Sequence, residues 1–108
     1  MRTLILAAAV AALAAAPAAA ATRTVRVDDN YFGSNGSPPT VKVDKGTVVR
    51  WRWRGSRRHN VAVASGPRIF RSKTKRTGDF ERTMRVRGTY RIICEVHEPG
   101  MRMKLVVE

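Results

Sequence analysis

Apolar and polar residues alternate along most of the chain after residue 22, and no segment there shows the periodicity of a helix. Residues 24–28 and 41–44 alternate valine with polar or charged residues, which is the period of a half-buried strand. Residues 49–54 alternate one valine and two tryptophans with three arginines. That segment therefore predicts a strand with one apolar face and one cationic face.

The same alternation continues towards the C-terminus. His59 shares the parity of two following valines, and Cys94 shares that of Tyr90 and Ile92, so both side chains are expected to face the interior. Residues 80–86 and 104–108 predict two more short strands. Turn signals separate the strands at residues 30–39, Gly46, Gly66-Pro67 and Gly88. Six or seven short strands of this kind predict an all-β fold, an antiparallel Greek-key β-sandwich.

The first residues have the composition of a secretory signal. Arg2 supplies a positive start, and residues 4–21 contain only Leu, Ile, Ala, Val and one Pro. Pro17 and the weakly apolar alanines argue against a membrane span. An uncleaved membrane anchor is the less favoured alternative. We therefore expect a signal peptide over residues 1–21, one small domain over residues 22–108, and a periplasmic or extracellular location.

The chain is strongly basic, with 21 Lys and Arg against 8 Asp and Glu and a formal net charge of +13. Charge of this size raises the question of nucleic acid. Trp51 and Trp53 share the parity of a core valine, however, so we expect them in the core and not as stacking platforms for bases. For an exported monomer we expect no nucleic-acid partner. The anionic partners would be an acidic protein, membrane headgroups or cell-wall polymers.

Four side chains form a specific set of metal donors. Cys94, His97 and Met101 lie within eight consecutive residues, and His59 is the only other histidine. Taken alone, each of these side chains can be explained by packing without a metal, as a small buried thiol, a core histidine or a core methionine. A lone cysteine in an exported protein nevertheless calls for a role, and two imidazoles, a thiolate and a thioether are the ligands of blue copper. The donor set therefore predicts a copper site.

From residue 25 to residue 107 the sequence resembles the cupredoxins, the small type 1 blue copper proteins of the plastocyanin, amicyanin and halocyanin group. The matching motifs are Asn30-Tyr31-Phe32, Val41-x-Val43-x-x-Gly46, Val49-x-Trp51, His59-Asn60-Val61, Phe70-x-Ser72, Gly78-x-Phe80, Gly88-Thr89-Tyr90 and Cys94-x-x-His97-x-x-x-Met101. The last motif, combined with His-Asn-Val, is the most specific. The resemblance implies a cupredoxin-like sandwich and one copper ion that cycles between Cu(I) and Cu(II).

The resemblance also implies the roles of individual residues. The copper ligands would be His59, Cys94, His97 and Met101, and Asn60 would support the Cys94 region through its backbone or side chain. Electrons would cross through the exposed edge of His97. The chain departs from the family in its intermediate His-to-Met spacing and in Met103, which stands where a glycine is frequent. Met103 is therefore a rival thioether, although its place at the start of the closing strand disfavours it.

The favoured function is an exported mononuclear blue copper protein that carries single electrons between redox partners and is not an enzyme. Its redox partner is expected to present an acidic docking surface. A protein that sequesters or delivers copper would use the same ligands and is the alternative. A zinc site with Glu95 or Glu98 is disfavoured because a thioether suits copper better. A hydrolase built on Cys94 lacks any sign of an oxyanion hole, and a basic adhesion module would leave the donor pattern to coincidence.

Arg57 and Arg58 immediately precede His59. Fixed positive charge near copper disfavours Cu(II) relative to Cu(I), so we expect this pair to raise the reduction potential. Salt screens exposed charges beyond about 8 Å at physiological ionic strength, and the expected rise is therefore modest.

Overall fold

The computed structural model describes residues 20–33 and 38–108. Residues 1–19 of the predicted signal peptide lie outside the described residues, and the cleavage of this peptide stays a prediction. Residues 20–33 and 38–108 contain eight strands: β1 (Thr22–Asp28), β2 (Tyr31–Phe32), β3 (Thr40–Val43), β4 (Val48–Trp53), β5 (Ala62–Ser65), β6 (Asp79–Thr83), β7 (Gly88–Ile93) and β8 (Arg102–Val107). None of the described residues is helical, and the described part of the chain thus contains no helix that could span a membrane.

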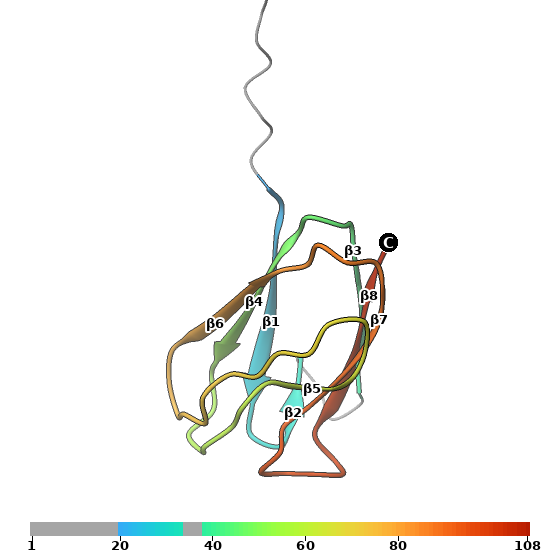
Figure 1. Cartoon of the computed structure of the whole chain (residues 1–108). Coiled ribbons are helices and arrows are strands. Elements are labelled where there is room, and N and C mark those ends of the chain that lie inside the picture. The colour runs from blue at the N-terminus through green and yellow to red at the C-terminus, as the bar shows by residue number, and fades with distance from the viewer. Residues whose placement is uncertain (1–19, 34–37) are drawn as a thin grey trace, which may run out of the picture.

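The strands form two four-stranded sheets that pack face to face (Figure 1). The first sheet has the order β2-β1-β4-β6 and the second the order β3-β8-β7-β5. The predicted β-sandwich is confirmed, but its sheets are mixed rather than purely antiparallel, because β1 pairs with β4, and β3 with β8, in parallel. Parallel pairing needs a crossover instead of a hairpin. Side-chain alternation defines the faces of a strand and not its direction, so the sequence pattern does not reveal these crossovers.

The inner faces of the two sheets form one hydrophobic core. Trp51 and Tyr90 are among its largest side chains, and both are 0% exposed. Trp53 is also buried, which confirms that the two tryptophans belong to the core. The rings of Phe70 and Phe80 each lie 5.8 Å from the ring of Trp51, centroid to centroid, in tilted contacts. Aromatic packing of this kind joins β4 and β6 to the segment that follows β5.

The cationic face of β4 lies on the outside of the first sheet. Arg50 binds Glu81 of β6 at 2.5 Å, and Arg52 binds Asp79 at 3.2 Å. These groups are all at least partly exposed, so each pair contributes at most about 1 kcal/mol. Arg82 shares the parity of Phe80 and Met84, but it is exposed and lies over the ring of Phe80, 5.3 Å from its centroid. The exposed guanidinium thus makes a cation–π contact with this ring.

A short hairpin at the start of the chain is not apparent from the sequence. The turn signals predict a loop over residues 30–39, yet Tyr31 and Phe32 form β2, which pairs antiparallel with the end of β1. The connection consists of Asp29 and Asn30, and Asn30 has a left-handed backbone with φ of 70°. Asparagine tolerates this conformation better than most residues. Strand pairing on both sides of the turn therefore fixes the backbone of Asp29.

Trp51→Ala should strongly destabilise the fold, because it removes a fully buried indole from the centre of the core. We expect the free energy of unfolding of the metal-free protein, measured by urea denaturation, to fall by about 3–5 kcal/mol. Ile69 is 72% exposed, so Ile69→Ala is the control and should change the same quantity by no more than about 0.5 kcal/mol. Equal losses in the two variants would contradict this account of the core.

Candidate metal centre

Strand pairing gathers the candidate donors at one end of the second sheet. His59 lies shortly before β5, Cys94 directly after β7, Met101 directly before β8, and His97 in the loop between β7 and β8. Because β7 pairs antiparallel with both β5 and β8, the start of β5, the end of β7 and the start of β8 lie together. Residues that are far apart in sequence thus reach the same end of the sandwich.

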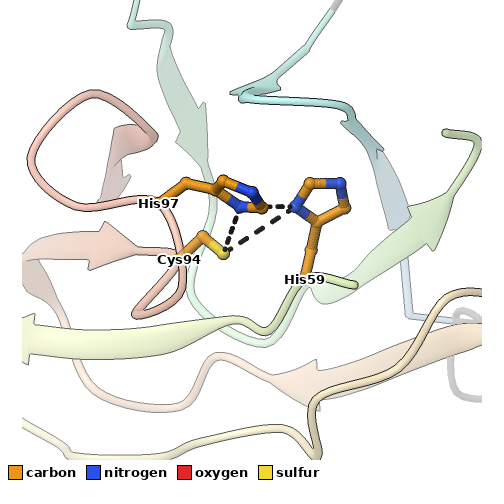
Figure 2. Close-up of side chains that lie close together, drawn as sticks. All are labelled: His59, Cys94 and His97. Carbon is orange, nitrogen blue, oxygen red and sulfur yellow. Dashed lines mark hydrogen bonds between the residues drawn. The ribbon is translucent and has the colours of Figure 1, made fainter. Parts of the chain in front are cut away.

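The donor atoms of His59, Cys94 and His97 converge on one point (Figure 2). Cys94 Sγ lies 3.8 Å from His59 Nδ1 and 3.5 Å from His97 Nδ1. The two Nδ1 atoms are 3.1 Å apart. His59 and Cys94 are 0% exposed, whereas His97 is partly exposed. The three atoms form a small, mostly buried triangle that a single metal ion can bridge.

Main-chain hydrogen bonds hold the loop from Cys94 to Met101 in a compact shape. The N–H of Cys94 donates to the carbonyl of Met101 at 3.0 Å, and the N–H of His97 donates to the carbonyl of Cys94 at 3.2 Å. The N–H of Met101 donates to the carbonyl of His97 at 3.2 Å. Met101 is 1% exposed. The loop therefore positions its donors as one unit, with the methionine buried at its end.

Met103, the rival thioether, already has a partner. The indole Nε1–H of Trp51 donates to Met103 Sδ at 3.5 Å. Met103 is 2% exposed and stands opposite Ile92 in the pairing of β7 with β8. Its sulfur therefore lies in the hydrophobic core, beside the indole.

Asn60 joins the segments that carry the donors. Its side-chain NH₂ donates to Glu95 Oε1 at 2.8 Å, and its side-chain oxygen accepts the main-chain N–H of Glu95, also at 2.8 Å. Glu95 in addition binds Arg71 at 2.7 Å. Among the described residues, neither Glu95 nor Glu98 belongs to the group of converging donors. The arrangement therefore ties the residue after His59 to the residue after Cys94 and leaves the zinc alternative without its carboxylate.

Asp29 contacts the site, although no pattern in the sequence points to it. Its Oδ1 lies 2.8 Å from His59 Nε2, the ring nitrogen that does not face Cys94. The same carboxylate accepts the N–H of Ser56 at 3.1 Å and that of Arg57 at 2.9 Å. These hydrogen bonds, above all the one to His59, hold the pKa of Asp29 well below its usual range. Thirty residues separate Asp29 from His59, so only the folded hairpin reveals their contact.

The surroundings of His97 disfavour its protonation. Burial lowers the pKa of His97 from its ordinary value, and the proximity of His59 and Arg57 lowers it further, while Asp29 acts in the opposite direction. A neutral imidazole has the free lone pair that a metal ion needs. The environment of His97 therefore favours the metal-binding form near neutral pH.

The lowered pKa of His97 predicts how the stability of the metal-free protein depends on pH. The unfolded chain binds a proton at His97 near pH 6.5, whereas the folded chain binds it only at lower pH. Between these values the unfolded state holds more protons, so the free energy of unfolding falls as the pH falls below about 6.5. Urea denaturation at about pH 7.5 and about pH 5.5 should show a larger loss in the parent chain than in His97→Gln. An equal loss would contradict the prediction.

Known structures share this fold. No family model and no curated protein matches the sequence. A mutant of amicyanin in the Cu(I) state is 25% identical with a TM-score of 0.67, over 81% of this chain and 82% of that one. Another amicyanin mutant, in the reduced state, is 25% identical with a TM-score of 0.68, over 85% and 87%. The Cu-containing nitrite reductase of Thermus scotoductus SA-01 is 23% identical with a TM-score of 0.64, over 79% of this chain and 22% of the reductase, and shows the fold alone.

The chemistry of the donors fits a single copper ion. A buried thiol and two imidazole nitrogens share one small triangle, and a buried methionine ends the loop that carries two of them. Soft sulfur and imidazole ligands suit copper, whereas carboxylates and carbonyls suit magnesium or calcium. The amicyanin-like fold points to the same ion. The chain therefore has a cupredoxin-like fold, with a His-Cys-His site that fits a blue copper protein.

Proposed function

We propose that the chain is an exported mononuclear blue copper protein that carries single electrons between redox partners. We propose further that His59, Cys94, His97 and Met101 hold the ion. The observation that carries this proposal is the convergence of two imidazole nitrogens and one thiol sulfur, all within 4.8 Å of one another, in an amicyanin-like sandwich. Copper bound there would supply one-electron chemistry between Cu(I) and Cu(II).

The residues around the donors keep the site rigid and largely dry. His59 and Cys94 are fully buried, so their side chains do not meet bulk water. Hydrogen bonds within the loop and between Asn60 and Glu95 restrict movement of the donors. A site whose ligands barely move between oxidation states exchanges electrons quickly, because little has to reorganise around the metal. These contacts therefore support a carrier.

His97 is the proposed route for electrons because it is the donor that reaches the surface. Its side chain is partly exposed, and the neighbouring Val96 is 52% exposed. A partner that docks over this loop would approach the imidazole edge directly.

Met101 is the proposed fourth donor in place of Met103. The loop that contains His97 also ends at Met101, whose main chain is bonded to both Cys94 and His97. Met103 belongs to β8, and its sulfur accepts the N–H of the Trp51 indole. Bringing Met103 to the site would break that hydrogen bond and leave a buried indole N–H unpaired, which costs about 1–3 kcal/mol.

The charge of the chain supports an acidic redox partner. Arginines already bind four of the eight acidic side chains, namely those of Asp28, Asp79, Glu81 and Glu95. The surplus of cationic groups can attract anionic groups outside the chain; the net charge is +13 for the full sequence and +12 without Arg2. We propose a monomer, released by cleavage of residues 1–21, whose partner presents an acidic docking surface. Anionic membrane or cell-wall surfaces are a further place of association, and nucleic acid is not a partner.

Copper loading tests the proposed site directly. Adding Cu(II) to purified residues 22–108 should produce an intense visible thiolate-to-copper band and an electron-spin-resonance signal with small hyperfine splitting. Cys94→Ser should abolish the band without loss of the circular-dichroism spectrum of the fold, whereas Met103→Leu should keep it. A folded parent chain without the band would overturn the proposal. Copper that is bound and readily released, but not reversibly reduced, would favour sequestration or delivery instead.

The double variant Arg57→Gln, Arg58→Gln should have a lower reduction potential than the parent chain, because positive charge near the site disfavours Cu(II). Both side chains are exposed, so the drop should be modest and should shrink as salt is added. The matched control is Arg85→Gln, Arg87→Gln, which removes the same amount of charge from the segment that follows the C-terminal end of β6. Protein-film voltammetry would measure all three potentials. Identical values would contradict the prediction that Arg57 and Arg58 raise the reduction potential.

A further inference from the structure

Asp29 lies behind His59, on the side of the ring that points away from the other donors. Its carboxylate is 2.8 Å from His59 Nε2, while His59 Nδ1 faces Cys94 and His97. His59 is 0% exposed, so water does not compete for its nitrogens. Both ring nitrogens are therefore assigned, Nε2 to the first hairpin and Nδ1 to the candidate metal centre.

The hydrogen bonds of Asp29 decide which nitrogen of His59 carries the proton. An ionised carboxylate can only accept hydrogen bonds, and Asp29 also accepts the N–H groups of Ser56 and Arg57. The contact with His59 therefore requires a proton on Nε2. In the neutral ring, Nδ1 is then unprotonated, and it lies 3.1 Å from His97 Nδ1 and 3.8 Å from Cys94 Sγ.

The backbone holds Asp29 firmly in this position. Asp29 is the first residue of the two-residue turn between β1 and β2, and its N–H donates to the carboxylate of Asp28 at 2.9 Å. Gly55 lies directly against it, because a Cβ on Gly55 would collide with Asp29 Oδ1 and stand 2.8 Å from its main-chain nitrogen. A glycine at position 55 lets the segment before His59 close over the carboxylate. The hairpin and Gly55 thus both hold Asp29 in contact with His59.

We propose that Asp29 is a positioning residue of this copper site, which holds His59 with Nδ1 free for the metal and places a negative charge behind that ligand. This inference deepens the proposed function and rests on it. A carboxylate that accepts the second N–H of a ligating histidine fixes the ring and strengthens it as a donor. In this chain the carboxylate comes from a hairpin 30 residues before the histidine.

The charge of Asp29 opposes the charge of the arginines beside His59. Negative charge near the metal favours Cu(II), whereas positive charge favours Cu(I). Asp29 bonds the ring directly, whereas Arg57 and Arg58 are exposed and screened by solvent and salt. Asp29 therefore has the larger effect on the reduction potential, and it lowers that potential.

The first test uses the metal-free protein, so it does not depend on copper. Nitrogen-15 chemical shifts of the imidazoles report which nitrogen is protonated. The parent chain should show His59 with a proton on Nε2 alone, and Asp29→Ala should show a mixture of tautomers. Asp29→Asn keeps an oxygen that can accept the N–H, so it should retain the parent tautomer. This variant is the one to measure if Asp29→Ala does not fold. A parent His59 protonated on Nδ1, or the parent tautomer unchanged in a folded Asp29→Ala, would overturn the positioning role.

The second test measures the charge of Asp29 in the copper-loaded protein. In Asp29→Asn the binding ratio of Cu(I) to Cu(II) should rise about tenfold, which is about 59 mV for a one-electron couple. Asp44→Asn removes an exposed carboxylate that follows β3 and should leave the potential unchanged. Equal potentials for Asp29→Asn and the parent chain would overturn the electrostatic role.

The two tests separate this inference from the proposed function. If the parent chain folds but does not form the copper–thiolate band, the carrier proposal fails, while the nitrogen-15 shifts still decide whether Asp29 sets the tautomer. If the band forms but neither the tautomer nor the potential responds to Asp29, the carrier stands and this inference fails.

Discussion

The structure depends on placing polar side chains at one end of an apolar core with every one of them hydrogen-bonded. His59 and Asn60 are 0% and 3% exposed, and an unpaired polar group at such depth costs about 1–3 kcal/mol. Asp29 binds the first and Glu95 the second. Within the described part of the chain, no buried side-chain nitrogen or oxygen lacks a partner. These polar side chains can be buried so deeply only because each of them has a hydrogen-bond partner.

The contacts that satisfy these buried groups are also the contacts that hold the donors. The Asn60–Glu95 pair spans from the His59 segment to the Cys94 loop, and the main chain of that loop bonds back on itself at Met101. Stability and metal-site geometry therefore share the same hydrogen bonds. A site restrained by such hydrogen bonds suits an ion whose coordination must change little between oxidation states.

Charges have different roles in different parts of the molecule. On the outer face of the first sheet, Arg50 and Arg52 are neutralised by carboxylates on the next strand. At the candidate metal centre, Asp29 and the adjacent Arg57 bring charges of opposite sign close to one imidazole. The remaining cations give the chain its net charge of +13, which acts at longer range on whatever docks against it.

Local sequence is enough to predict most of the strands, their inward faces and the candidate donors. The pleat of a strand forces side chains to alternate, so the inward direction of Trp51 and Cys94 follows from their neighbours alone, and three donors crowd into one short loop. Only the folded chain shows the parallel strand pairs, the β1–β2 hairpin, the indole contact of Met103 and the contact of Asp29 with His59. Each of these depends on segments far apart in sequence, whose meeting is decided by crossovers and packing and leaves no periodic trace in the order of residues.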